Sequence, residues 1–235
     1  MTLAITPLPL AAAVAAGEDL CAHLFDALDG AGLVLAPGDL VVVTSKVVAK
    51  SEGRVVAFSG LDADKVRLIE SESRRVLRRR GPLLITETHH GFVNANAGVD
   101  LSNADDGTAV LLPRDPDRSA RRLRGEIRRR RGVDVGVVIT DTFGRAWRNG
   151  VCDVAIGSAG VRALLDLRGT FDANGRVLEA TEVAIADEVA AAANLVMGKA
   201  ASTPFALLRG LDASFFGEGS VGQDLVRRPH DDLFR

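Results

Sequence analysis

The sequence has almost no cysteine and no spaced group of cysteines and histidines. Its two cysteines, Cys21 and Cys152, stand far apart in the chain. This excludes a disulfide scaffold and a zinc ribbon, and it suits a reducing cytosol. The chain also lacks a strong net charge, because 29 lysines and arginines are balanced by 31 acidic residues. The overall charge therefore gives no reason to expect nucleic acid or a membrane surface as a partner.

The sequence also lacks a targeting segment and a membrane-spanning segment. The residues that follow Met1 have no basic stretch of the kind that begins a signal peptide. The alanine-rich stretch Leu10–Ala16 is too short to cross a bilayer. Hydrophobic residues make up 47% of the 235 positions, which is enough for a real core. We expect a cytoplasmic protein that folds as one large domain or two small lobes.

Two common nucleotide-binding motifs are absent. Gly217–Gly222 matches the pattern G-x-G-x-x-G, but too few residues follow it for the strand–helix–strand unit that this motif opens. Gly198-Lys199 resembles the end of a P-loop, yet Ala193 and Ala200 replace the first glycine and the hydroxyl residue of that loop. We therefore expect neither a Rossmann site nor a P-loop.

Lysine is scarce, and this scarcity is informative. Only four of the 29 basic residues are lysines, namely Lys46, Lys50, Lys65 and Lys199. Arginine evidently serves wherever any surface cation is sufficient. A retained lysine therefore favours a position that needs a compact ammonium group, which the planar guanidinium cannot replace.

The segments that are present alternate irregularly between strand and helix patterns. Continuous apolar runs predict buried strands, and apolar residues one turn apart predict helices. This order favours an α+β fold with a mixed sheet. We expect strands at Leu3–Pro7, Leu40–Thr44, Arg54–Phe58, Leu83–Thr88, Ala109–Leu112, Val133–Thr140 and Pro204–Leu208. We expect helices at Glu18–Leu28, Asp62–Arg80 and Asp115–Arg130, and a fourth helix that Thr181 caps and that continues through Met197. A turn is expected at Asn174-Gly175.

The segment Thr140–Gly150 follows the most apolar strand and is predicted to be an active-site loop. Asp141 and Thr142 can hold a divalent ion against phosphates. Arg145 and Arg148 can bind phosphate or carboxylate with two hydrogen bonds each. Trp147, the only tryptophan, either stacks on a ligand ring or closes the core. A purely structural loop is the alternative.

Three other segments carry chemistry of the same kind. In Gly91–Asn103, Asp100 offers an oxygen ligand for Mg²⁺ or Mn²⁺ and Asn103 can bind a base or sugar, although the segment could also be a plain turn. Ser45 and Lys50 follow a buried strand and can bind phosphate, and Leu195–Ser202 can line a nucleotide pocket. The adjacent His89 and His90 lack metal-ligand spacing, which favours a structural or substrate-side role.

Together these residues predict an enzyme that uses a metal ion and a nucleotide. They comprise two carboxylates, a hydroxyl group, lysines and arginines, without a serine or cysteine nucleophile paired to histidine. Such a site positions phosphate groups and neutralises charge as it develops.

The motifs resemble those of the coenzyme F420-0:L-glutamate ligase family. The resemblance covers nearly the whole chain in order, and it is most specific at Val138–Gly150, with support from Ala97–Asn103, Thr181–Glu188 and Thr44–Arg54. It implies a GTP-dependent enzyme that adds L-glutamate to the deazaflavin precursor F420-0 through γ-glutamyl links. It also implies two α+β subdomains, and a homodimer with the site in an interface groove.

The resemblance also implies roles for individual residues. Asp100 and Asp141 would bind Mg²⁺ or Mn²⁺, with Thr142 at a second metal position and potassium as a further cation. Asp141, Lys50 and Arg145 would be catalytic, through an acyl phosphate made from the γ-phosphate of GTP. The residues implied to bind GTP are Ser45, Lys50, Asn103, Ala11, Ala12, Ala13, Val14, Leu195, Val196, Met197, Gly198, Lys199, Ala200, Ala201 and Ser202.

Two other functions are compatible with the same residues. One is an amide ligase of the same mechanism that acts on another acid, because the substrate side of the sequence is the hardest part to interpret. The other is a GTP-binding module without turnover. The presence of both Asp100 and Asp141 counts against a GTP-binding module without turnover.

Overall fold

The computed structural model describes residues 2–101, 107–198 and 202–233, and a mixed five-stranded sheet lies at its centre. The strand order is β1-β12-β2-β8-β9. Strands β2 and β8 are parallel, and every other neighbouring pair is antiparallel. The predicted α+β fold with a mixed sheet is confirmed. The strands are β1 (Ala4–Leu8), β12 (Phe205–Arg209), β2 (Leu40–Thr44), β8 (Gly136–Arg145) and β9 (Arg148–Ala159).

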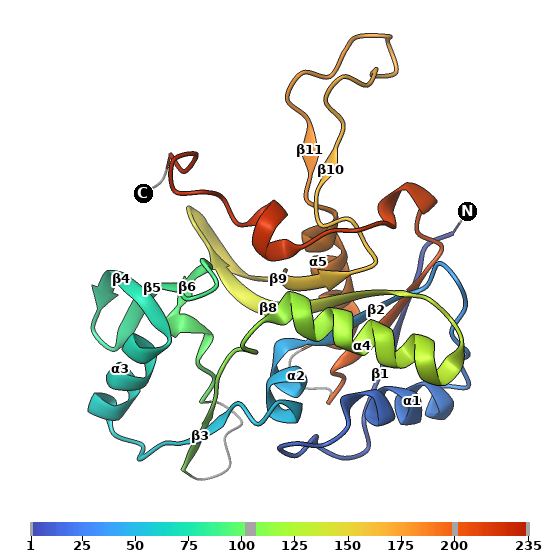
Figure 1. The fold of residues 1–235 in the computed structure, drawn as a ribbon. Helices are drawn as coiled ribbons and strands as arrows, with labels where there is room; N and C mark the ends of the chain where they lie inside the picture. Colours follow the sequence, from blue (N-terminus) through green and yellow to red (C-terminus); the bar gives the residue numbers. More distant parts are fainter. Residues whose placement is uncertain (1, 102–106, 199–201, 234–235) are drawn as a thin grey trace.

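Strands β2 and β8 are the interior of this sheet because their sequences are continuously apolar. Leu40–Val43 and Val137–Ile139 have no exposed surface, as expected for strands that are covered on both faces. Helix α4 (Pro116–Arg131) covers one face and helix α5 (Ile185–Met197) the other (Figure 1). Helix α1 (Leu20–Gly30) packs beside α4.

Local signals fix the ends of these helices. Asp115 accepts a hydrogen bond from the backbone of Arg118 at the start of α4, and Pro116 occupies its first turn. Gly132 ends α4 with a left-handed backbone (φ 69°). Asp19 caps α1 in the same way as Asp115 caps α4. The predicted starts of both helices are therefore correct to within two residues.

A second, smaller layer stands beside the central sheet (Figure 1). It contains a three-stranded sheet, a helix, and a separate hydrophobic cluster made of Ile69, Leu84 and Ala97. The prediction of two lobes within residues 1–235 stays a prediction. The elements of this layer and its connections are α3 (Asp62–Ser71), β4 (Ser73–Arg80), β5 (Leu83–Thr88), β6 (Val93–Ala95), the short helix η1 (Asn96–Gly98), and the pair β3 (Val55–Ala57) and β7 (Thr108–Val110).

The long helix predicted at Asp62–Arg80 is wrong in its second half. Helix α3 ends at Ser71, and Ser73–Arg80 forms strand β4 against β5. The Ser73 hydroxyl donates to the carbonyl oxygen of Ile69 at 2.6 Å, which satisfies one of the last acceptors of the helix. Pairing with β5 has overridden the helix propensity of the arginine-rich stretch.

The predicted loop Thr140–Gly150 is mostly strand. Strands β8 and β9 continue to Arg145 and from Arg148, so that only Ala146 and Trp147 make the turn of a long hairpin. Trp147 takes a left-handed backbone there (φ 57°) and is 82% exposed. Of its two predicted roles, closing the core is therefore wrong.

A narrow arm projects from the body between β9 and α5 (Figure 1). Its stem is the pair β10 (Leu165–Asp166) and β11 (Glu182–Val183). Near its tip Gly175 donates to the carbonyl oxygen of Asp172, which confirms the turn predicted at Asn174-Gly175. The cap predicted at Thr181 is wrong: α5 begins at Ile185, because the residues just after Thr181 pair with β10.

Candidate active site

Several segments that are far apart in sequence meet at one edge of the central sheet. Because β12 is antiparallel to both β1 and β2, strands β1, β2 and β8 all run in the same direction. Their carboxyl ends, together with the start of β12, define what we call the carboxyl edge: Leu8–Leu10, Thr44–Lys46, Thr140–Thr142 and Ser202–Pro204. Two backbone bonds join these segments, from Leu10 to Ser202 (3.0 Å) and from Thr44 to Pro204 (2.9 Å).

The two carboxylates that the sequence predicts as metal ligands are both held at this edge. The Ser45 hydroxyl donates to Asp141 Oδ1 at 2.9 Å. The Lys46 Nζ lies 2.7 Å from Asp100 Oδ2. Ser45 and Lys46 are consecutive residues at the start of helix α2 (Ser45–Ser51). The structure therefore brings Asp100 and Asp141 to neighbouring partners, although 40 residues separate them in the chain.

These oxygen donors fit a small divalent cation. Carboxylates and hydroxyl groups are the ligands that Mg²⁺ and Mn²⁺ prefer. Within the described ranges, no cluster of three or more histidine, cysteine or acidic side chains could hold a metal by itself. Mg²⁺ usually takes one or two carboxylates and completes its shell with water and substrate phosphates. The pair Asp100 and Asp141 fits that pattern better than a protein-only cage.

The Thr142 side chain points to the face of β8 opposite that of Asp141, because successive side chains of a strand point to opposite sides. Its hydroxyl donates to Asp153 Oδ1 across the hairpin at 2.6 Å. Asp153 is only 3% exposed, and the sequence reasoning missed it. The sequence feature that could have identified Asp153 is its position as an acidic residue inside the otherwise apolar run Val151–Ile156.

Of the residues predicted to bind nucleotide, Ser45 is bonded to Asp141, and Lys50 lies on the same helix α2. Ser45 is 6% exposed and Lys50 lies in the last turn of α2. The Lys50 carbonyl oxygen accepts a hydrogen bond from Gly17 N at 3.1 Å. This bond connects α2 to the end of the predicted segment Ala11–Val14, in which the three alanines are exposed and Val14 is buried.

The other predicted nucleotide segment, Leu195–Ser202, runs from the end of α5 to the carboxyl edge. Leu195 is 86% exposed and Met197 is 1% exposed. The Met197 side chain thus belongs to the core, and only the backbone of that residue could meet a ligand. Residues Lys199, Ala200 and Ala201, like Asn103, lie outside the described residues.

Arg145 is not brought to the carboxylates. It lies near the hairpin tip, four residues beyond Asp141, which corresponds to about 13 Å along a strand. Its guanidinium donates to the carbonyl oxygen of Asn149 at 2.9 Å and so closes the turn. Its predicted catalytic role stays a prediction.

His90 is held by the protein backbone and by a neighbouring aromatic ring. Its Nε2 lies 2.9 Å from the carbonyl oxygen of Pro113, and its ring stacks on Phe92 with centroids 5.5 Å apart. Burial lowers the pKa of the imidazole, which favours the neutral form at neutral pH. His89 is exposed and bonds to the backbone of Ser71 instead. The two histidines therefore point to different partners, as the absence of metal-ligand spacing predicts.

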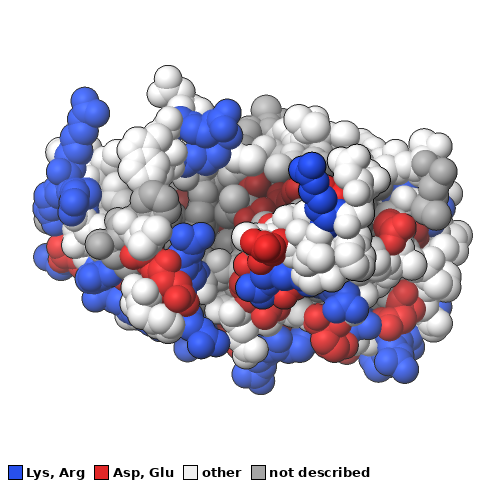
Figure 2. All heavy atoms as spheres, turned by 90° about the horizontal axis from the view of Figure 1, so that it is seen from above, with Lys and Arg blue, Asp and Glu red and all other residues white. Residues whose placement is uncertain are grey.

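The surface above the central sheet is hollowed (Figure 2). Acidic side chains are visible inside the hollow, and lysine and arginine side chains stand around it. Such an arrangement places carboxylates where a cation could bind and positive charge where an anionic substrate would approach. None of the helices in the described ranges is long and apolar enough to cross a membrane.

Comparisons with known proteins agree with the motifs at this edge. A family model described as F420-0:Gamma-glutamyl ligase matches residues 10–210. A protein of Methanopyrus kandleri named coenzyme F420:L-glutamate ligase is 41% identical, over 100% of this chain and 98% of its own length. Proteins of the same name are 38% identical in Methanothermobacter thermautotrophicus, over 94% of each chain, and 41% identical in Methanocaldococcus jannaschii, over 84% and 85%.

The match spans every residue of the carboxyl edge except Leu8 and Pro9. It therefore includes Ser45, Asp100 and Asp141. Because the family model and the relatives match most of its length, the chain belongs to the F420-0:gamma-glutamyl ligase family.

Proposed function

We propose that the protein adds L-glutamate to F420-0 through γ-glutamyl links, in coenzyme F420 biosynthesis, with GTP as the source of energy. The family membership supports the ligase class. The observation that carries the proposal is the pair of carboxylates at the carboxyl edge, Asp141 bonded to Ser45 and Asp100 paired with Lys46. Carboxylates beside lysines at a sheet edge suit the handling of a metal–nucleotide complex.

The reaction would proceed in two steps. A carboxylate oxygen of F420-0 attacks the γ-phosphorus of GTP, the bond to the β-phosphate oxygen breaks, and GDP leaves. The product of this step is an acyl phosphate. The amine of glutamate then attacks the acyl carbon and loses a proton, and inorganic phosphate leaves with the oxygen that came from the carboxylate. An amide bond has formed and one GTP has been consumed.

The residues at the carboxyl edge have distinct tasks in this reaction. Asp100 and Asp141 would hold Mg²⁺ or Mn²⁺, which when bound neutralises charge on the phosphates. The Ser45 hydroxyl fixes the Asp141 carboxylate through its hydrogen bond. Lys46 and Lys50, on the same short helix, would attract the phosphates as point charges. Thr142, whose hydroxyl bonds to Asp153 on the other face of β8, would serve a second metal position, and potassium would be a further cation.

The proposal includes a homodimer with the site at the interface. The arm that carries β10 and β11 supports this part, since it projects from the body (Figure 1) and exposes Phe171 (69%) and Val177 (53%). Exposed apolar side chains on a projecting element commonly mark a protein contact. Sedimentation of the purified protein measures the stoichiometry directly.

A single reaction tests the proposed function. The purified protein is incubated with GTP, Mn²⁺, L-glutamate and F420-0, and the products are analysed by mass spectrometry. We expect a mass gain of glutamyl units together with glutamate-dependent GDP. Asp141→Asn should lower the rate by about a hundredfold or more. The control is Asp134→Asn, two residues before the start of β8 and away from the carboxyl edge, which should stay near the wild-type rate.

The other outcomes separate the alternatives. If GDP forms with another carboxylic acid but not with F420-0, the protein is an amide ligase that acts on that acid. GTP binding without glutamate-dependent GDP under varied metal ions would establish a nucleotide-binding module. Near-normal turnover of Asp141→Asn would refute the assignment of Asp141.

A further inference from the structure

A cavity of about 270 Å³ lies against the β8–β9 hairpin, where residues next to Asp141 line it. Val154 lines this cavity, and it is the residue opposite Asp141 in the β8–β9 hairpin. Phe143 lines it too, two residues after Asp141 on the same face of β8. Two residues along a strand span about 7 Å. The cavity therefore begins within one side-chain length of the carboxylate that the proposed function places at the reacting centre.

The walls of this cavity are mostly aromatic and aliphatic. The rings of Phe92 and Phe143 meet edge to face with centroids 6.0 Å apart. The Phe92 ring is in turn fixed by the stacked His90. Val221 and Val226 close the side formed by the C-terminal segment. Walls of this kind accept a flat, weakly polar ring, because aromatic edges and faces contact rings favourably.

Three charged residues, Asp187, Arg227 and Asp232, interrupt the apolar walls. Asp187, in the first turn of α5, points one carboxylate oxygen at the backbone N–H of Ala155, 2.9 Å away. Burial raises the pKa of this carboxyl, so the site disfavours a second negative charge near it. Arg227 is exposed and lines the same cavity. A ligand here would keep its neutral part inside and its anionic part toward the arginine or the carboxyl edge.

We propose that this cavity seats the ring system of the acid that is ligated and holds its reacting carboxylate toward Asp141. This inference rests on the proposed function. It assigns Phe143 and Val226 to substrate specificity, not to the chemical step.

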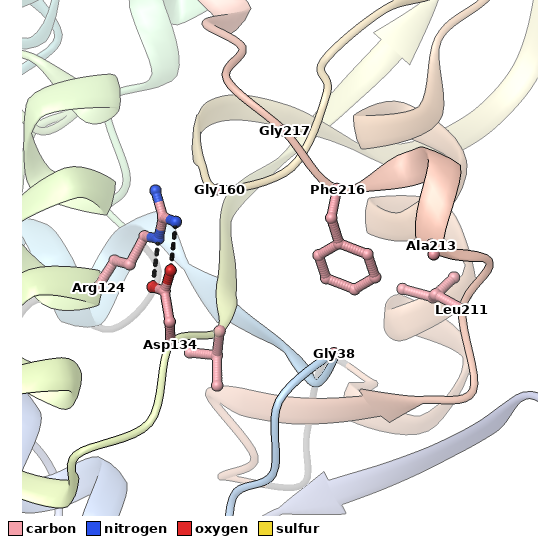
Figure 3. Close-up of a pocket in the computed structure, with 9 residues that line it drawn as sticks. Gly38, Arg124, Asp134, Gly160, Leu211, Ala213, Phe216 and Gly217 are labelled. Carbon is pink, nitrogen blue, oxygen red and sulfur yellow. Dashed lines mark hydrogen bonds and ion pairs between the residues drawn. The ribbon is translucent and has the colours of Figure 1, made fainter.

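A second cavity, of about 370 Å³, lies at the other end of the strands (Figure 3). Gly38 and Asp134, which line it, precede β2 and β8, so it faces away from the carboxyl edge. Its charged groups already satisfy each other, because Arg124 makes two hydrogen bonds to Asp134 at 2.8 and 2.7 Å. The ring of Phe216 lies on the opposite side of the cavity (Figure 3). This cavity provides a matched control.

The test compares variants that fill or empty each cavity. Val226→Trp should fill the cavity beside Asp141, and Phe143→Ala should remove one of its walls. We expect each to raise the KM for F420-0 about tenfold or more, equivalent to at least ~1.4 kcal/mol, with the KM values for GTP and glutamate within about twofold of the wild type. Ala213→Trp, in the second cavity, should leave all three KM values unchanged.

Equilibrium binding of F420-0 to each variant, followed by its fluorescence, gives a readout that does not depend on turnover. Circular dichroism melts confirm that each variant is folded. If the wild type forms product but Phe143→Ala and Val226→Trp keep the wild-type KM and affinity for F420-0, the subsite is refuted and the proposed function stands. If the wild type forms no product from F420-0, the proposed function is refuted and the subsite falls with it.

Discussion

At the scale of single residues, the sequence pointed to the chemistry of the site but not to all of its partners. Asp100 and Asp141 could be predicted because each follows or lies in a small, polar segment next to an apolar run. Lys46 was visible only as one of four lysines, and its pairing with Asp100 at 2.7 Å depends on a contact that no local pattern encodes. Asp153 was missed for the same reason: its partner, Thr142, faces it across a hairpin.

Asp187 gives a prediction about pH that belongs to this scale. Burial raises the pKa of its carboxyl above the ordinary value of 3.8. A raised pKa in the folded state means that the contribution of this group to stability is present below about pH 3.8 and is lost as pH rises through the higher value. Asp187→Asn keeps an acceptor for the Ala155 N–H and does not ionise. The stability of this variant relative to wild type should therefore increase from about pH 4 to about pH 7, measured as the urea midpoint.

The matched control has the opposite sign. Asp212 is exposed and accepts hydrogen bonds from Ser214, which lower the pKa of its carboxyl. A lowered pKa stabilises the fold above the unfolded value and loses that stabilisation as pH falls. Asp212→Asn should therefore lose stability relative to wild type as pH rises toward 3.8, and the difference should be nearly constant from about pH 5 to about pH 7. Equal pH profiles for Asp187→Asn and wild type would contradict the role given to burial at Asp187.

At the scale of elements, apolar runs and helix caps in the sequence predicted helices and strands correctly, whereas strands that depend on a pairing partner could not be predicted. The strands at Leu40–Thr44 and Val133–Thr140 and the start of α4 were predicted because burial on both faces and the Asp115-Pro116 signal are local. The strand Ser73–Arg80 was mistaken for helix, since its only structural reason is its pairing with β5. The hairpin at Thr140–Gly150 looked like a loop, because its polar residues suggested function, not pairing.

One element, the C-terminal segment, depends on a single buried side chain. Asp117 is 8% exposed and accepts hydrogen bonds from the backbone of Ser158, Val221 and Gly222 and from the Ser220 hydroxyl. It therefore holds η3 (Val221–Leu225) against β9. Asp117→Ala leaves several buried donors without an acceptor, and we expect it to destabilise the fold by about 2–4 kcal/mol, measured by urea unfolding.

Asp224→Ala is the control for this prediction. Asp224 accepts a hydrogen bond from Ser220 N at 2.8 Å, but on the exposed surface, where water can replace the lost acceptor. Its removal should cost less than about 1 kcal/mol. If Asp117→Ala were as stable as Asp224→Ala, the segment from Ser220 onward would not depend on Asp117.

At the scale of the whole molecule, the fold class followed from the sequence while the meeting point of its segments did not. An irregular order of strands and helices indicates an α+β protein, but only the parallel pairing of β2 with β8 and the placement of β12 show that Ser45, Asp141 and Ser202 share one edge. The family resemblance implied that grouping in advance, because it assigns Ser45, Asp141 and Ser202 to one site. The cavity beside Asp141 could not be predicted from the sequence or from the resemblance, since its walls come from five separate segments.

The central claim is that the carboxyl edge makes an acyl phosphate from the acceptor acid and GTP. The most direct measurement uses F420-0 whose carboxylate carries heavy oxygen (¹⁸O), with mass analysis of the phosphate that is released. We predict that the first amide bond formed on each F420-0 transfers one heavy oxygen to inorganic phosphate, and that Asp141→Asn lowers phosphate release and label transfer together. Product with a single glutamate accompanied only by unlabelled phosphate, or by pyrophosphate, would contradict the claim.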